Sequence, residues 1–149
     1  MKERIMSKDL MNKIDALGAQ EYMSDAQLAV FEEHLRGEHE RLIVRQQEIT
    51  NTSMKNPESI SGDEADKANA IQSSADARAE SEKNKAMLRS VSVALQAIKT
   101  RDYGYCIKCG EEIGLKRMIS QPAACRDIEC ETLEERKNKQ NPAANLKIS

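Results

Sequence analysis

All four cysteines of this 149-residue chain lie within 25 residues of one another, and this cluster constrains the fold more than any other feature. Thiolates gathered so closely are most simply explained by one tetrahedral zinc site. A disulfide or a set of free thiols is the alternative. The candidate ligands are Cys106, Cys109, Cys125 and Cys130.

The first half of the cluster, Cys106-Ile-Lys-Cys109-Gly110, has the sequence of a zinc knuckle. Two residues separate its cysteines, and the glycine after them tolerates the left-handed backbone that lets main-chain amides point toward sulfur. This half of the cluster therefore favours a metal over a disulfide.

The second half is less regular, because four residues separate Cys125 from Cys130, more than in an ordinary knuckle. If a helix begins at residue 127, Asp127 and Cys130 lie one turn apart on the same face. Cys125 could then bind a metal only from the preceding loop. The fourth ligand is thus either Cys125 or, with an oxygen donor, Asp127, and a degenerate site holding little or no metal is the third alternative.

The composition favours extended, solvated helices over a thick globular core. The chain has one Phe, three Tyr and no Trp, and 32% of its residues are charged. No apolar run approaches the roughly 18 residues that a membrane span needs, and the N-terminus lacks a signal-peptide stretch. We therefore expect no membrane association and a reducing, cytoplasmic location, which again favours a metal over a disulfide.

The charges are nearly balanced, with 23 basic and 25 acidic residues and a formal net charge of −2. A protein that holds nucleic acid by releasing counterions needs an excess of positive charge. We therefore expect no direct sequence-specific DNA binding, and a zinc module that contacts protein.

Two long segments have seam residues at alternating steps of three and four, the spacing of coiled-coil helices. The first begins at the N-cap signal Ser24-Asp25 and the second runs from about Asp63 to Lys99, with a loop at 51–62 between them. Helices joined by one short loop pack antiparallel. The seam residues are Leu28, Phe31, Leu35, Glu38, Leu42, Arg45, Ile49 and Thr52, followed by Ala70, Ser74, Ala77, Ser81, Asn84, Leu88, Val91, Leu95 and Ile98.

The seam is large and apolar at one end, with Leu28, Phe31 and Leu88, and small at the other, with Ala70 and Ala77. Small seam residues let two helices approach closely, so the far end should be slim. The predicted fold is therefore mainly α, a narrow two-helix finger on a small base that contains the cysteine module.

The chain divides into four predicted parts. Residues 1–20 form a weakly amphipathic helix or a frayed arm with no assigned role. Residues 21–100 form the antiparallel coiled coil, with its tip near 52–68. Residues 101–140 form the zinc-finger module with a C-terminal helix, and 141–149 lack periodicity, which predicts a disordered tail.

Acidic residues gather where the second helix begins, at the end of the finger. Asp63, Glu64 and Asp66 fall in or next to its first turn, where the helix dipole favours anions, so capping alone can explain them. The alternative is functional: an acidic tip on a finger could enter a channel in a partner and approach a metal or a basic loop there.

These residues resemble the DksA/TraR family of RNA polymerase secondary-channel regulators. The resemblance extends over roughly residues 21–136. It is most specific in Tyr103-Gly-Tyr-Cys-Ile-Lys-Cys-Gly-Glu-Glu-Ile-Gly114, which is followed by Arg117 and Pro122.

The tip signature of that family, Asp-x-x-Asp-x-Ala, matches Asp63, Asp66 and Ala68, at the expected distance before Cys106. Two independent motifs that agree in order and spacing are far less probable by chance than either one alone. The resemblance therefore makes the functional interpretation of the tip the preferred one.

The resemblance implies an antiparallel coiled coil on a base that the four-cysteine module builds with a C-terminal helix, here about Asp127 to Gln140. It also implies a monomer that is not an enzyme, binds RNA polymerase without touching DNA, and inserts its finger through the secondary channel. Asp63 and Asp66 would then lie near the catalytic centre of the polymerase and shift the stability of its promoter complexes.

Two departures from the family pattern limit what the resemblance implies. The usual third cysteine is replaced by Asp127, and Cys125 stands two places earlier, so zinc is implied less firmly than the finger. The basic residues with which some members bind the alarmone guanosine tetraphosphate are replaced by Ser90, Gln121 and Glu131. Because phosphate sites rely on charge-assisted contacts, we expect weak or absent alarmone synergy.

Two other classes of function also fit an acidic finger. A transcript-cleavage factor of the GreA type would use its tip carboxylates to hold a second magnesium ion. A structural coiled-coil or zinc-ribbon interaction protein would instead continue its seam into an intermolecular bundle.

Overall fold

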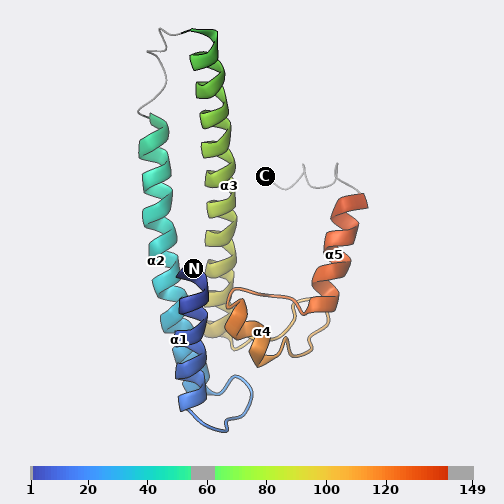
Figure 1. The fold of residues 1–149 in the computed structure, drawn as a ribbon. Coiled ribbons are helices and arrows are strands. Elements are labelled where there is room, and N and C mark those ends of the chain that lie inside the picture. Colours follow the sequence, from blue (N-terminus) through green and yellow to red (C-terminus); the bar gives the residue numbers. More distant parts are fainter. Residues whose placement is uncertain (1, 55–62, 141–149) are drawn as a thin grey trace.

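The computed structural model describes residues 2–54 and 63–140 of the chain. Across these residues the structure is helical, with an isolated bridge between Tyr105 and Glu112 and no named strand. Two long antiparallel helices form a finger, and the other helices gather around one of its ends (Figure 1). The predicted mainly α finger on a small base is confirmed. The helices are α1 (Lys2–Ala16), α2 (Asp25–Met54), α3 (Glu64–Thr100), α4 (Leu115–Ser120) and α5 (Ile128–Gln140).

The start of α2 follows the predicted cap, because the Ser24 hydroxyl accepts a hydrogen bond of 3.4 Å from the Gln27 N–H. At its other end α2 continues to Met54, past the predicted start of the loop at residue 51. The rest of that loop, residues 55–62, lies outside the described residues, as does the tail at 141–149 for which disorder was predicted. At the base, α3 ends at Thr100, and the C-cap residue Arg101 is left-handed at a φ of 63°.

The contact between α2 and α3 buries most of the large residues of the predicted seam. Phe31 and Leu35 have no exposed surface, while Leu95 is only half-buried and its neighbour Ala94 is buried in its place. Arg45, a predicted seam position, is exposed and forms an ion pair with Glu80 across the two helices. The buried seam residues are Leu28, Phe31, Leu35, Leu42 and Ile49 in α2, and Asn84, Val91, Ala94 and Ile98 in α3.

A polar layer interrupts this apolar contact midway along the finger. The buried Asn84 amide donates hydrogen bonds of 3.0 Å to the Leu42 carbonyl and to Gln46 Oε1. Gln46 Nε2 in turn donates a bond of 2.9 Å to Ser81 Oγ. Because one register alone satisfies these buried groups, the layer specifies how α2 and α3 align.

Helix α1, to which the sequence assigned no role, is part of the base. Leu10 and Ile14 are buried, at 1% and 3% exposure, against α2 and α4. Lys13 Nζ lies 3.3 Å from a Glu33 carboxylate oxygen of α2. The N-terminal segment therefore closes one side of the core at the foot of the finger.

The short helix α4, which the sequence analysis did not predict, contributes the buried Met118 to the same core. Next to it, the Phe31 and Tyr103 rings lie 5.3 Å apart between centroids, and the Tyr103 hydroxyl donates a 2.7 Å hydrogen bond to the Pro122 carbonyl. These contacts join the cysteine-containing loop to the finger.

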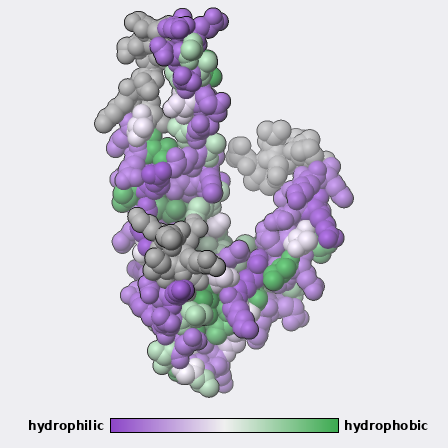
Figure 2. All heavy atoms as spheres, viewed as in Figure 1, coloured by the Kyte–Doolittle hydropathy of each residue, from purple (hydrophilic) through white to green (hydrophobic). Residues whose placement is uncertain are grey.

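The surface agrees with the charged composition. Hydrophilic residues dominate the visible face along the finger and on α5, and hydrophobic residues appear there in small groups (Figure 2). Within the described part of the chain, we find no helix that has both the length and the apolar character needed to cross a bilayer.

We predict that Asn84→Ala lowers the free energy of unfolding by about 1–3 kcal/mol, because Gln46 Oε1 loses its donor in a buried layer. Denaturant unfolding followed by circular dichroism measures this change. The matched control is Gln72→Ala, which removes an exposed amide from the same helix, bonded only to Asp76. Its effect should stay within about 0.5 kcal/mol, and equal losses in the two variants would contradict a structural role for the polar layer.

Candidate metal centre and finger tip

The knuckle is a tight loop that follows α3. The Gly110 N–H donates a hydrogen bond of 2.9 Å to the Cys106 carbonyl, and the Cys106 N–H donates one of 2.8 Å to the Glu111 carbonyl. Gly110 has a φ of 78°, as its place after Cys109 predicted. A Cβ there would meet nothing within 4 Å, so the left-handed backbone alone accounts for the glycine.

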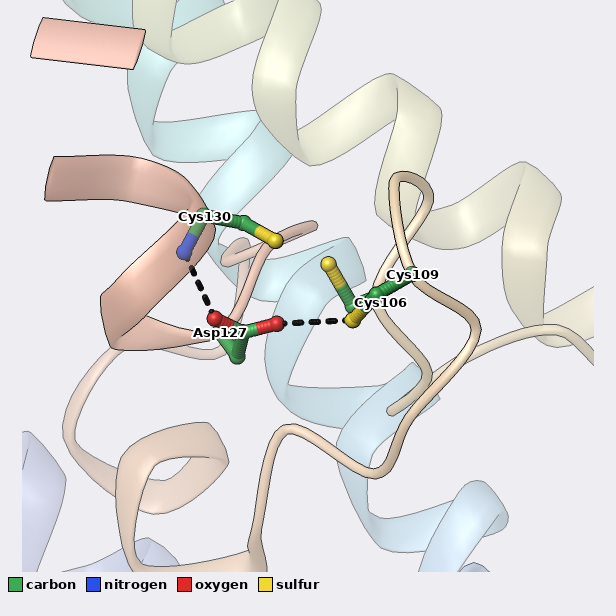
Figure 3. A group of neighbouring side chains, drawn as sticks. All are labelled: Cys106, Cys109, Asp127 and Cys130. Atoms are coloured by element: carbon green, nitrogen blue, oxygen red, sulfur yellow. Dashed lines mark hydrogen bonds between the residues drawn. The ribbon is translucent and has the colours of Figure 1, made fainter. Parts of the chain in front are cut away.

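The other half of the site is the first turn of α5. Asp127 immediately precedes this helix, and its Oδ1 accepts a hydrogen bond of 2.7 Å from the Cys130 N–H. Its main-chain carbonyl accepts a bond of 3.0 Å from the Glu131 N–H. Asp127 is therefore the N-cap of α5. This geometry sets Asp127 and Cys130 one turn apart on the side that faces the knuckle (Figure 3).

Four ligand atoms converge between the knuckle and α5. They are the sulfurs of Cys106, Cys109 and Cys130 and a carboxylate oxygen of Asp127, all within 4.8 Å of one another. Two sulfurs bound to one tetrahedral zinc ion lie about 3.8 Å apart. The four atoms are therefore close enough to surround one ion after small shifts, and the residues fit a structural zinc site.

Cys125 stands outside this group. The Ile107 N–H donates a hydrogen bond of 3.0 Å to its carbonyl, which ties its backbone to the knuckle, while Cys125 itself lines a cleft beside α3. Of the two alternatives for the fourth ligand, the geometry favours Asp127. The candidate ligand set then has Asp127 in place of Cys125, because the N-cap residue Asp127 and Cys130 in the first turn of α5 both face the knuckle.

Hydrogen bonding distributes charge unevenly over this group. Burial by itself raises the pKa of Cys106, but the N–H groups of Cys109, Asp127 and Lys108 outweigh it, and the pKa falls below its ordinary value. Burial raises the pKa of Cys130 to about 12, and the Asp127 carboxylate adds to the rise.

The Asp127 carboxylate is the acceptor in the group. Cys109 Sγ donates to its Oδ2 over 3.0 Å, which raises the pKa of Cys109. The same bond, followed by the one from the Cys130 N–H, holds the pKa of Asp127 well below its usual range. Asp127 is therefore ionised at neutral pH while Cys109 and Cys130 carry protons, which a metal would displace on binding.

Tyr22, which the sequence analysis did not single out, attaches the knuckle to the segment before α2. Its hydroxyl donates a 2.6 Å hydrogen bond to the Gly104 carbonyl and accepts one of 3.1 Å from the Gly114 N–H. A Cβ on Gly104 would lie 2.7 Å from Met23 Cγ, and the residue has a φ of 88°, so a side chain does not fit there. The sequence around Tyr22 carries no signal for this contact, which forms across 82 residues.

The acidic residues of the tip lie at the end of α3 that is far from the base (Figure 1). Asp63 occupies the N-cap position, and its main-chain carbonyl accepts the Asp66 N–H over 3.1 Å, but its side chain makes no capping hydrogen bond. Asp63, Asp66 and Ala68 are all exposed. Capping thus leaves the Asp63 carboxylate unexplained, and both carboxylates face solvent at the described edge of the tip.

A cleft of about 920 Å³ lies between the finger and the segment from α4 to α5. Its lining includes Ser90, Gln121 and Glu131, the three positions at which the resemblance implied lost basic residues. Lys83 and Arg126 also line the cleft. Arg126 lies 3.5 Å from the Glu131 carboxylate, which neutralises the positive charge of Arg126.

Comparisons with known proteins point to one family. No protein-family model matches the chain. The RNA polymerase-binding transcription factor DksA of Haemophilus influenzae is 29% identical over 143 residues, which cover 91% of this chain and 98% of that protein. The protein of the same name from Escherichia coli K12 is 30% identical over 123 residues, 81% of this chain and 80% of that one. The solved structure of transcription factor DksA2 from Pseudomonas aeruginosa matches with a TM-score of 0.69 and 25% identity, over 93% of this chain and 99% of that one.

Proposed function

Because the chain belongs to the DksA family, we propose that it binds RNA polymerase directly and modulates transcription initiation by inserting its finger into the secondary channel. The observation that carries this proposal is the pair of exposed carboxylates, Asp63 and Asp66, at the far end of a narrow two-helix finger. With such a partner, we propose that the protein acts in the bacterial cytoplasm.

The dimensions of the finger support this mode of binding. Helix α3 has 37 residues and therefore spans about 55 Å at 1.5 Å per residue. Near the tip its contact with α2 relies on half-buried small residues, Ala70 and Ala77, which keep this end slim. A finger of this shape can carry two negative charges deep into a channel, where they act without covalent chemistry. The effect on initiation follows from differential binding, since the factor favours the polymerase conformations that accept it.

The same observations weigh against the other two classes of function. The relatives are named transcription factors, which separates this chain from a cleavage factor of the GreA type. Leu42, Ile49 and Val91 are buried between α2 and α3 of one chain, so in the described part of the finger these seam residues are not available for an intermolecular bundle. We therefore propose a monomer without enzymatic activity, and its net charge of −2 favours contact with protein and no direct sequence-specific DNA binding.

For the metal centre, we propose one zinc ion held by Cys106, Cys109, Cys130 and Asp127. Three thiolates and a carboxylate are a suitable donor set for tetrahedral zinc. Bound there, the ion would supply no reaction chemistry, and the four residues would join the knuckle to the first turn of α5. This role matches the position of the site in the base, away from the acidic tip.

We predict that Asp66→Asn abolishes most of the effect on initiation while leaving the fold intact, because Asp66 is exposed and supports no described contact through its side chain. Losing one charge-assisted contact to polymerase should weaken the effect roughly tenfold or more. Purified polymerase on a ribosomal-RNA-type promoter, assayed without the alarmone, measures this loss.

Asp76→Asn is the matched control for the tip variant. It removes the same charge from an exposed site on the same helix, ten residues closer to the base, and should retain wild-type inhibition. Equal loss in both variants would indicate a general charge effect. Release of short RNA fragments from a backtracked complex would instead support a cleavage factor.

We predict that guanosine tetraphosphate changes the effect of this protein on initiation by less than about twofold, since Ser90, Gln121 and Glu131 in its cleft supply no positive charge to a phosphate. A titration of the alarmone in the same assay tests this. The variant carrying Ser90→Lys, Gln121→Arg and Glu131→Lys restores three positive charges and also frees Arg126 from its partner, so it should gain synergy. Strong enhancement of the wild-type chain would overturn the prediction.

We predict that the wild-type chain retains one zinc ion per molecule and that Cys109→Ser lowers the zinc affinity roughly tenfold or more, because zinc binds thiolate far better than hydroxyl. Cys125→Ser, the matched control, should retain wild-type stoichiometry, since Cys125 lies outside the ligand group. Competition with a chromophoric chelator measures both affinities. Loss of zinc in the Cys125 variant would restore the four-cysteine ligand set.

A further inference from the structure

We propose that Asp127 divides its carboxylate between the metal and α5, so that zinc binding determines how firmly α5 is seated and thereby positions one wall of the cleft. This inference rests on the zinc site proposed above. Asp127 differs from a fourth cysteine ligand because its carboxylate has a second oxygen atom, which can cap α5.

The first step is that packing does not hold α5 in place. Among the described helices, none makes a helix–helix contact with α5, which stands apart from the finger (Figure 1). None of its residues is buried, and Ile128 and Leu133 are 63% and 55% exposed. Burial of apolar surface, the usual stabiliser of a helix in a protein, therefore contributes little to its position.

The second step identifies what does hold it. The Lys108 ammonium of the knuckle lies 2.9 Å from the Glu134 carboxylate, and Arg117 Nε donates a 3.2 Å hydrogen bond to the Arg126 carbonyl just before the helix. The ion pair is partly exposed and such pairs contribute little. A further attachment is the ligand group itself, in which Asp127 and Cys130 belong to the start of α5 and the other two ligands to the knuckle, and Cys130 also packs against the core.

The third step is the arrangement of the two carboxylate oxygens. Oδ1 of Asp127 accepts the Cys130 N–H, and Oδ2 faces Cys109 Sγ at 3.0 Å (Figure 3). One oxygen thus caps the helix while the other points into the ligand group. A cysteine here would supply a metal ligand with a poor cap, and an asparagine would supply a cap with a poor ligand. Only a carboxylate serves both partners well.

The fourth step connects the helix to the cleft. Ile128, Glu131, Thr132 and Glu135 of α5 line the cleft opposite residues of α2 and α3. Because no other described helix packs against α5, the position of this wall follows from the anchoring of α5 at its first turn, where Cys130 also packs against the core. Zinc held through Asp127 therefore sets the shape of the cleft.

The experiment measures amide hydrogen exchange across α5, from Thr132 to Gln140, in the full-length chain with zinc and with a chelator. In the wild type, zinc should slow exchange in this segment roughly tenfold while the buried seam of α2 and α3 stays unchanged. Asp127→Asn keeps an oxygen that can cap α5, so its zinc-free helix should exchange at the rate of the zinc-free wild type, but it should bind zinc roughly tenfold more weakly or worse. Asp127→Cys should bind zinc at least as tightly as the wild type and lose most of the zinc-dependent protection of α5.

The outcomes separate this inference from the zinc site on which it rests. A wild-type chain that binds zinc without any change in α5 exchange overturns the inference and leaves the zinc site standing. The same holds if the Asp127→Cys variant binds zinc and gains full protection of α5. A wild-type chain that binds no zinc overturns both, while the polymerase proposal, tested at Asp66, is unaffected. The control Cys125→Ser should behave as the wild type in both measurements.

Discussion

The packing of α2 against α3 is the interaction on which the rest of the structure depends. Along the finger beyond the base, α2 and α3 pack only against each other among the described helices. Their one seam must therefore bury the apolar surface that a globular protein would bury in a core with many elements. The polar layer at Asn84 adds specificity, because slipping the register by one residue would move the tip by about 1.5 Å and leave buried amides unpaired. The reach of the acidic tip is therefore set by side-chain contacts in the middle of the finger.

The finger could be predicted from the sequence because its signal is local. The spacing of Leu28, Phe31 and Leu35 identifies a helix face without reference to any other part of the chain. Helix α1 could not be assigned a role in the same way. Leu10 and Ile14 have the spacing of many short amphipathic helices, and only their contact with α2 and α4 makes them part of a core.

In the candidate site, too, local motifs could be predicted from the sequence, while choices that depend on the fold could not. The knuckle was predictable, since Cys106, Cys109 and the glycine after them form a contiguous motif. The choice between Cys125 and Asp127 was not, because it depends on where α5 begins and on which of its residues face the knuckle. The state of the Asp63 side chain also required the structure, since a residue at an N-cap position does not always make the capping hydrogen bond.

A carboxylate in place of a fourth thiolate leaves the summed ligand charge unchanged, so the substitution alters ligand softness and helix capping more than electrostatics. Its influence on the tip is limited by distance. Helix α3 separates its end at the base from Asp66 by about 51 Å, several times the screening length of about 8 Å at physiological salt. A change at the metal centre can therefore reach the tip only through the packing and register of the seam, which the layer around Asn84 holds in place. On the proposed function, the acidic tip would consequently act on polymerase whether or not the base carries a metal, and the proposed zinc site would act on the neighbouring cleft.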